Sequence, residues 1–199
     1  MKIIDCVQGS EEWFKARCGI PTASEFDKII TTEGKASKQR EKYMYRLAGE
    51  AIIGKPEETY KNGNMERGTL LEDEARQAYS LISGNEVIQV GFCDSESGYG
   101  ASPDGLIGND GLLEIKCPTL AVHVSYLLGN KLPTDYFQQV QGELLVTGRK
   151  WADFVSYYPG IKPLIVRVKR DEDFIERLRV ELEVFYVELT EVVKMLGGK

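Results

Sequence analysis

Two short stretches near the middle of the chain decide the fold: Ser102-Pro103-Asp104-Gly105 and Leu113-Glu114-Ile115-Lys116. Between them lies Gly108-Asn109-Asp110-Gly111, and such a cluster of Gly, Asn and Asp between apolar residues is typical of a tight β-hairpin turn. The sequence therefore predicts two antiparallel strands that bring the two stretches together.

Asp104, Glu114 and Lys116 are expected to meet when this hairpin forms. Alternate residues of a strand share a face, so Glu114 and Lys116 project to the same side. A three-residue loop places Asp104 directly opposite Glu114, whereas a four-residue loop shifts it by one position. Either register brings two carboxylates and an ammonium group into one small volume, where the carboxylates could hold a hard cation such as Mg²⁺.

The alternative interpretation is a surface hairpin with a Glu–Lys pair, since aspartate is common in turns for structural reasons. The Pro-Asp pair and the Glu-x-Lys pair are more informative together than either is alone. Pro-Asp is followed, ten residues after the aspartate, by Glu-x-Lys, with apolar residues between them. This arrangement resembles the signature of the PD-(D/E)xK nucleases.

The composition narrows the class of protein. The 199 residues contain 42% apolar and 28% charged side chains, which excludes a disordered or fibrous chain. No apolar run approaches the ~20 residues of a membrane span, and the N-terminus lacks the apolar stretch of a secretory signal. The net charge of −6 excludes a generic, basic nucleic-acid coat protein. A protein that holds cations on clustered carboxylates can nevertheless act on a polyanion.

Cysteine and histidine are too sparse for several kinds of site. No Cys-x-x-Cys pair is present, and the single histidine, His123, is expected to be structural or solvent-facing. This excludes a zinc site of the usual spacing and a serine or cysteine hydrolase triad. The cysteines are expected to be free thiols in a reducing cytoplasm, so the chemistry falls to carboxylates and lysine. They are Cys6, Cys18, Cys93 and Cys117.

The remaining pattern predicts a single α/β domain over residues 1–199, with a short mixed central sheet flanked by helices. The core motifs lie within residues 17–148, and C-terminal strands and a long helix follow over residues 151–196. Thr22-Ala23-Ser24-Glu25 has the pattern of a capping box that opens a helix running to about Ile30. Helices are expected over residues 10–19, 22–30, 39–53, 65–83, 121–128, 134–147 and 171–196, and strands over 87–93, 99–107, 112–116, 151–158 and 164–168.

The helix expected over residues 65–83 carries an acid near its apolar stripe. Glu72 lies at the edge of that stripe, whereas Asp73 points away from it. Glu72 either reaches water at the border or supplies a third carboxylate to the predicted site, because an inward acid is costly unless it is paired or bound to a metal.

Five motifs in compatible order extend the pattern beyond the hairpin. The chain resembles lambda exonuclease and the YqaJ-type viral recombinase nucleases, which are PD-(D/E)xK enzymes with a restriction-endonuclease-like core. The resemblance covers most of the chain up to about Gly148. It is carried by residues 17–24 (RCGIPTAS), 67–72 (RGTLLE), 102–105 (SPDG), 114–116 (EIK) and 139–141 (QVQ).

The resemblance implies a metal-dependent exonuclease that digests one strand of linear double-stranded DNA from the 5′ end. It implies two Mg²⁺ ions, with Mn²⁺ as a substitute, and a homotrimeric ring that encircles the DNA. The product would be a 3′ single-stranded overhang, which a phage-type single-strand annealing protein receives. A phage or prophage origin and action in the cytoplasm of a bacterial host, away from membranes, are further expectations.

The resemblance also assigns roles to residues of the predicted site. Asp104 and Glu114 match the family's metal ligands, and the backbone carbonyl of Ile115 is expected to add another. Glu72 matches a helix glutamate at the second metal ion. Asp94, ten residues before Asp104, matches a further family acid.

Two more matched residues act on the reaction itself. Lys116 matches the catalytic lysine that orients or deprotonates the attacking water. Gln139 matches a helix glutamine that supports the nucleophile. Met65 stands where the family inserts an apolar wedge between the terminal base pairs, although a methionine at a helix start is more often part of the core.

Arg17, Thr22 and Ser24 match the family's pocket for the 5′ phosphate. A helix N-terminus attracts anions, and an arginine adds a planar fork of donors. The alternative is that Thr22 is only a helix cap. A basic segment over residues 35–46 is either a solvated face or a track for the DNA backbone.

Three other functions remain open from the sequence. One is a PD-(D/E)xK endonuclease, although a cutter of internal sites need not hold a 5′ phosphate. Another is a non-catalytic module that binds DNA ends, which the intact Asp104, Glu114 and Lys116 oppose. The third is an acidic protein-interaction domain, which fits the net charge but leaves the converging carboxylates unexplained.

Overall fold

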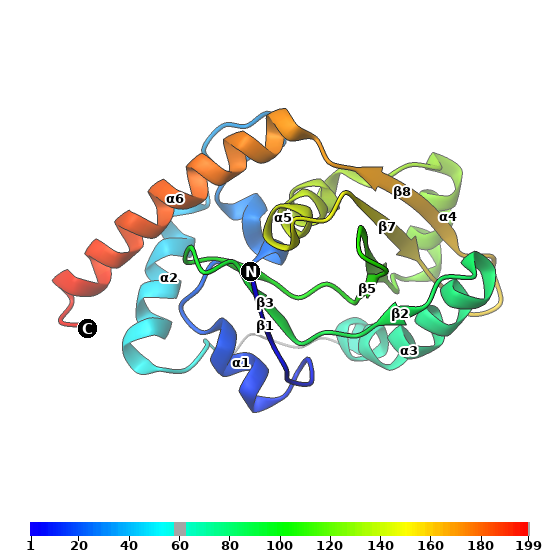
Figure 1. Cartoon of the computed structure of the whole chain (residues 1–199), viewed down its shortest axis with the longest axis horizontal. Coiled ribbons are helices and arrows are strands. Elements are labelled where there is room, and N and C mark those ends of the chain that lie inside the picture. The colour runs from blue at the N-terminus through cyan, green and yellow to red at the C-terminus, as the bar shows by residue number, and fades with distance from the viewer. Residues whose placement is uncertain (58–62, 199) are drawn as a thin grey trace.

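The computed structural model describes the backbone of residues 1–57 and 63–198, and the side chains of these residues except 63–69. Its larger sheet has the predicted hairpin in the interior (Figure 1). The strand order of this five-stranded sheet is β2 (Val87–Ile88), β5 (Gly105–Ile107), β6 (Gly111–Lys116), β7 (Trp151–Ser156) and β8 (Leu164–Lys169).

The β5–β6 hairpin adopts the shorter of the two predicted loops. Ile107 pairs with Gly111 and Gly105 pairs with Leu113, so three residues form the loop. Continued by one residue, this register sets Asp104 opposite Glu114. The carboxylate juxtaposition therefore follows from the length of the turn.

Helices cover both faces of β6. On one face Leu113 packs with Ala75 and Tyr79 of α3 (Gly63–Ser83). On the other face Leu112 packs with residues of α5 (Phe137–Thr147). The chain passes from β6 to the parallel strand β7 through α4 (Leu120–Gly129), the short 3₁₀ helix η2 (Thr134–Tyr136) and α5. The predicted α/β class with a mixed sheet flanked by helices is confirmed.

Two predicted strands were wrong in their extent. Each is divided between the larger sheet and a three-stranded sheet of order β1 (Lys2–Ile4), β3 (Phe92–Asp94) and β4 (Gly100–Ala101). The first divides near Gly91, where a Cβ would overlap the backbone of Cys6. The second divides at Pro103, which has no N–H to donate to a ladder. A close contact with the N-terminal segment thus accounts for the first division, and a proline within the predicted strand accounts for the second.

The predicted capping box at Thr22 was also wrong. The segment forms a short 3₁₀ helix, η1 (Ala23–Lys28), and the Thr22 side chain makes no capping hydrogen bond. Glu25, which the capping box requires near Thr22, instead pairs with Lys28 and Arg46. The preceding helix, α1 (Glu11–Arg17), begins as predicted, because Ser10 accepts a hydrogen bond from the backbone N–H of Trp13.

The long C-terminal helix α6 (Glu172–Met195) lies beside α2 (Arg40–Ile53), as Figure 1 shows. The helix has an apolar stripe whose residues Phe174, Leu178, Leu182, Phe185 and Leu189 are buried, whereas Leu196 after its end is exposed. Arg40 of the basic segment pairs with Glu188 of α6, so this charge serves packing between the two helices. None of the described helices is long and apolar enough to cross a membrane.

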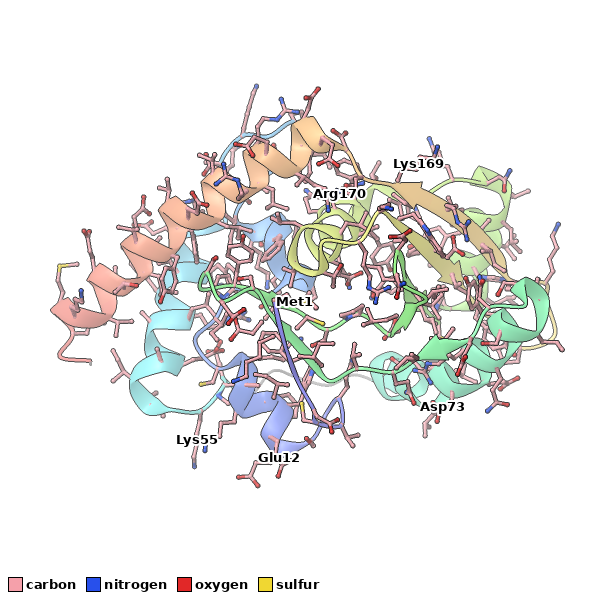
Figure 2. The ribbon with its side chains drawn as sticks, viewed as in Figure 1. Met1, Glu12, Lys55, Asp73, Lys169 and Arg170 are labelled. Atoms are coloured by element: carbon pink, nitrogen blue, oxygen red, sulfur yellow. The ribbon has the colours of Figure 1, made fainter. Side chains whose placement is uncertain are left out.

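Gln141 ties α5 to the connection between β8 and α6. Its Nε2 donates to the carbonyl of Lys169 (3.0 Å), and its Oε1 accepts from the backbone N–H of Asp171 (2.9 Å). Arg170, at the end of β8 in Figure 2, donates through Nη1 to the carbonyl of Leu144 (2.7 Å). The second glutamine of the 139–141 motif therefore has a structural role.

Gly142 allows α5 to approach η1 closely, and we expect Gly142→Ala to destabilise the protein. A Cβ at this position would overlap the ring of Phe26, which is fully buried and cannot move aside. Overpacking of this kind costs about 1–3 kcal/mol of the free energy of unfolding. Urea denaturation measures the loss.

Gly49→Ala is the matched control, because Gly49 lies within α2 and a Cβ there meets nothing within 4 Å. It should stabilise the protein by about 0.5–1 kcal/mol, since alanine is the better helix former. Equal effects of the two substitutions would contradict the close approach of α5 to η1.

Candidate active site

Glu114, Lys116 and Gln139 form the centre of the site at the carboxyl end of β6. Glu114 is 2% exposed, and its Oε1 lies 2.5 Å from Lys116 Nζ. The same oxygen accepts a hydrogen bond from Gln139 Nε2 (2.6 Å). The alternation of β6 places Glu114 on the α5 face, so the strand and the helix together bring these side chains into contact, as predicted.

Asp104 joins this cluster through the backbone of β6. Its Oδ2 accepts from the N–H of Ile115 (2.6 Å). Burial raises the pKa of Asp104 well above its ordinary value, and the charge of Glu114 raises it further, whereas Lys116 lowers it. Burial opposes the charge of Lys116, but Glu114 and Asp104 outweigh it and raise the pKa of Lys116. The lysine therefore stays protonated beside the carboxylates.

Glu72 approaches the cluster from α3. Arg76, one turn further along this helix, donates through Nε to the backbone carbonyl of Asp104 (3.3 Å). Burial raises the pKa of Glu72, Lys116 and Arg76 lower it, and Glu114 raises it. The inward alternative for Glu72 is thus favoured, while Asp73 lies on the outer surface with 78% of its side chain exposed (Figure 2).

Glu143 is a member of the cluster that sequence reasoning missed. It is 1% exposed, its Oε1 accepts from Gln139 Nε2 (3.0 Å), and no described group pairs with its Oε2. Burial raises the pKa of Glu143 well above its ordinary value, with the charge of Glu114 as the next cause. An unsatisfied buried oxygen costs about 1–3 kcal/mol. Its position four residues after Gln139, on the same helix face, was the available signal.

The donor set of the cluster fits a hard divalent cation. Asp104, Glu114 and Glu72 supply carboxylate oxygens, which Mg²⁺ and similar ions prefer. Of the positive charges that the structure describes, Lys116 pairs directly with one of these acids. Within the described part of the chain, no three acidic, histidine or cysteine side chains are already arranged around one point as metal ligands. Glu114 is instead engaged by Lys116 and Gln139.

Ile115, Asp94 and Met65 are three further predicted site residues. Ile115 contributes its backbone N–H to Asp104, while its side chain is buried against α3. Asp94 lies at the end of β3 in the smaller sheet, where its Oδ1 accepts from the backbone N–H of Glu96 (2.8 Å). The structure therefore gives Asp94 a turn contact rather than a contact with the cluster. The side chain of Met65 lies outside the described residues, and its predicted wedge role with it.

Arg17, Thr22 and Ser24 do come together, and Ser102 joins them. Arg17 Nη2 donates to Thr22 Oγ1 (3.3 Å) and Ser24 Oγ (3.5 Å), and Nη1 donates to Ser102 Oγ (3.2 Å). Trp13 stacks on the guanidinium, with the ring centroid 4.0 Å from Cζ. Sequence reasoning missed Trp13 and Ser102, although Ser102 stands two residues before Asp104.

The Arg17 guanidinium has hydroxyl groups rather than a carboxylate as its described hydrogen-bond partners. Burial lowers the pKa of Arg17, while Tyr43 and Glu25 raise it. A partly desolvated arginine with three hydroxyls around it suits an anion with several oxygens, such as a phosphate. Because η1 is a short 3₁₀ helix without a side-chain cap, we expect its N-terminus to contribute less to anion binding than the Arg17 guanidinium does.

His123 and the cysteines lie outside this chemistry. His123 is fully buried, and its ring nitrogens bond to Ser156 Oγ (2.8 Å) and the carbonyl of Lys162 (3.2 Å). His123 is therefore structural rather than solvent-facing, which is one of the two predicted alternatives. The cysteines are free thiols, as predicted.

Comparison with known proteins assigns the family. The model of the YqaJ-like viral recombinase domain matches residues 12–150, a range that contains every candidate site residue. The chain belongs to this family. A search of curated protein sequences found no match.

Solved structures extend the similarity to the C-terminal strands and α6. An alkaline exonuclease from Laribacter hongkongensis is 36% identical over 94% of this chain and 96% of its own, with a TM-score of 0.86, and so is its complex with dAMP. The family member described here is accordingly an exonuclease. A phage-related exonuclease from Haemophilus somnus 129PT covers 86% of this chain and 95% of its own at 16% identity and a TM-score of 0.66, which shows the shared fold.

The buried carboxylates predict a pH-dependent stability. Without divalent ions, Asp104→Asn should raise the free energy of unfolding at pH 8 and raise it less at pH 5. The pKa of Asp104 is raised in the folded state, so wild-type stability falls as pH rises from about 4, the ordinary pKa of aspartate, through the raised value. Asparagine has no charge to bury, and each pKa unit corresponds to about 1.4 kcal/mol.

Urea denaturation in EDTA across this pH range measures the effect. Asp110→Asn, in the exposed hairpin turn, is the control and should leave the pH profile as in wild type. An Asp104→Asn profile parallel to that of wild type would contradict the partly buried, charge-repelled environment of Asp104.

Proposed function

We propose that this exonuclease digests one strand of linear double-stranded DNA from the 5′ end, in a Mg²⁺-dependent reaction that leaves a 3′ single-stranded overhang. The observation that carries the proposal is the cluster of Asp104, Glu114, Lys116 and Gln139 at the end of β6. Paired acids beside a protonated lysine suit hydrolysis of a phosphodiester. The relative's complex with dAMP supports a nucleotide product.

Asp104, Glu114, Glu72 and the backbone carbonyl of Ile115 are the groups that would hold the cations. Two Mg²⁺ ions, or Mn²⁺ in their place, would stabilise the entering and leaving oxygens of an in-line displacement. The surplus of buried carboxylates over Lys116 supports this assignment, because bound cations would offset their mutual repulsion.

Lys116 acts on the attacking water and on the charge that develops at the phosphate. Its ammonium is held in place by Glu114 and lies 5.3 Å from the centroid of the Tyr136 ring, which limits its motion. Gln139, fixed by the same carboxylate, supports the nucleophile from α5.

The pocket around Arg17 supports the proposed polarity. A 5′ phosphate held there would be anchored close to Asp104 of the cluster, because Ser102, which accepts from Arg17, lies two residues before Asp104 in the chain. An enzyme that binds each new 5′ phosphate is biased to move one way along the duplex. This supports an exonuclease over an endonuclease, which has no need to hold an end.

The assembly and the setting are part of the same proposal. We infer a homotrimeric ring around the DNA, with a single-strand annealing protein as the recipient of the overhang, in the cytoplasm of a bacterial host and from phage or prophage. The match to a viral recombinase family supports this setting. Three exposed lysines of the basic segment remain available to the DNA backbone: Lys35, Lys38 and Lys42.

Digestion of end-labelled linear duplex, with and without Mg²⁺, tests the proposal. A 5′ label should appear in mononucleotides at once, whereas a 3′ label should stay in shrinking fragments. Cleavage of closed circular duplex would favour an endonuclease, and binding of ends without turnover would favour a non-catalytic module. Release of a 3′ label first would contradict the polarity.

Lys116→Ala should abolish most cleavage and leave DNA binding nearly intact. The lysine acts on the water and the transition state, and groups of this kind contribute about 10²–10⁴-fold in rate. Single-turnover digestion gives the rate, and DNA binding in Ca²⁺ verifies folding. Lys150→Ala, which removes an exposed lysine at the far end of β6, is the control and should cleave as wild type. Full activity of Lys116→Ala would refute this active site.

Arg17→Ala should erase most of the preference for a 5′-phosphorylated end over a 5′-hydroxyl end. A charge-assisted hydrogen bond is worth about 1.5–3 kcal/mol, or roughly 10- to 100-fold in relative rate. Digestion rates on the two duplexes measure the preference. Lys15→Ala removes an exposed charge from the same helix and should keep the preference. Unchanged discrimination in Arg17→Ala would show that the phosphate is bound elsewhere.

A further inference from the structure

The amide of Gln139 is held by two carboxylates at once. Its Nε2 donates to Glu114 Oε1 (2.6 Å) and to Glu143 Oε1 (3.0 Å), so both amide hydrogens are used. The opposite orientation of the amide would set its carbonyl oxygen against Glu114 Oε1, an acceptor that also faces Lys116 Nζ. Glu114 therefore selects the orientation of the amide, and Glu143 Oε1 holds the second amide hydrogen, so that Gln139 Oε1 is turned away from both acids.

Glu143 has no evident packing reason to be an acid. It lies on α5 one turn after Gln139, is 1% exposed, and leaves Oε2 without a described partner. An apolar side chain would fill the same space without an unsatisfied oxygen. Its side chain interacts with Glu114, and it accepts a hydrogen bond from Gln139 Nε2, the amide that also bonds to Glu114.

We propose that Glu143 is a positioning residue: it holds the Gln139 amide so that Gln139 Oε1 is presented to the attacking water as a hydrogen-bond acceptor. Glu143 itself does not touch the substrate. This inference rests on the proposed function, which gives Gln139 its role beside the nucleophile. The positioning role requires an acceptor oxygen at hydrogen-bond distance from Gln139 Nε2, and it does not require a negative charge.

Glu143→Gln and Glu143→Asp distinguish the position of the acceptor oxygen from the negative charge of the side chain. Glutamine keeps an acceptor oxygen at the same distance and has no charge. Aspartate keeps the charge but withdraws the oxygen by one methylene group. Positioning predicts that kcat of Glu143→Gln stays within about threefold of wild type, whereas kcat of Glu143→Asp falls about 10- to 100-fold, as for a misplaced catalytic group. KM for DNA and the Mg²⁺ concentration at half-maximal rate should be unchanged in both.

The dependence on Gln139 is tested by a double-mutant cycle. Gln139→Ala alone should lower kcat, and adding Glu143→Asp should lower it by no more than about a further threefold, because the residue that Glu143 positions is already gone. Gln141→Leu is the structural control on the same helix. It should lower the melting temperature while keeping kcat at temperatures where the protein is folded.

Three outcomes would overturn the inference. A loss in Glu143→Gln as large as in Glu143→Asp would show that the charge is needed. A shift in the half-maximal Mg²⁺ concentration would make Glu143 a cation ligand instead. Additive losses in the double variant would show that it acts without Gln139. These failures leave the proposed function standing, whereas full activity of Gln139→Ala would remove both the inference and the role proposed for Gln139.

Discussion

The excess of buried negative charge at the end of β6 is the constraint on which the rest of the structure depends. Asp104, Glu114 and Glu143 crowd around Lys116, which pairs directly with Glu114. Such a cluster is unstable unless surrounding elements hold it closed. Packing of α3 on one face of β6 and α5 on the other supplies that support. Bound cations would relieve the repulsion among these acids, which is why we propose the cluster as a cation site.

Different faces of helix α5 connect this site to different parts of the molecule. Gln139 and Glu143 face the carboxylate cluster, and Gly142 receives the ring of Phe26 from η1. Gln141 reaches the β8–α6 connection. Since η1 follows directly on Thr22 of the Arg17 pocket, α5 keeps the proposed phosphate pocket and the cluster at a set separation.

An acidic protein that acts on DNA must place positive charge near its DNA-binding surface, because its net charge repels the DNA. The net charge is −6, yet the pocket around Arg17 is lined with hydroxyl groups and an aromatic ring rather than carboxylates. Arg40 and Arg46 form ion pairs with Glu188 and Glu25, respectively, within the fold. Under the proposed function, attraction of the substrate would depend on a few exposed lysines, on Arg17 and on the cations that the site would hold.

The sequence by itself determined the features that depend on neighbours in the chain. The turn at residues 108–111 limited the register to two alternatives, and strand alternation put Glu114 and Lys116 on one face. The apolar period of α6 and the acid at the edge of the α3 stripe were likewise local signals. The family resemblance supplied Gln139 and Arg17, which spacing alone could not have assigned.

Tertiary structure decided what depends on distant partners. Arg46 draws Glu25 away from Thr22, so the expected capping box becomes a 3₁₀ helix. The strand predicted over residues 87–93 divides near Gly91, where the backbone of Cys6 comes close. Ser102 belongs to the proposed phosphate pocket because Arg17 donates to it across 85 positions of sequence. Glu143 meets Glu114, which belongs to another element, only in the folded protein. Local patterns specify backbone periodicity, whereas the environment of a charged side chain is set by whichever opposite or like charge the fold brings to it.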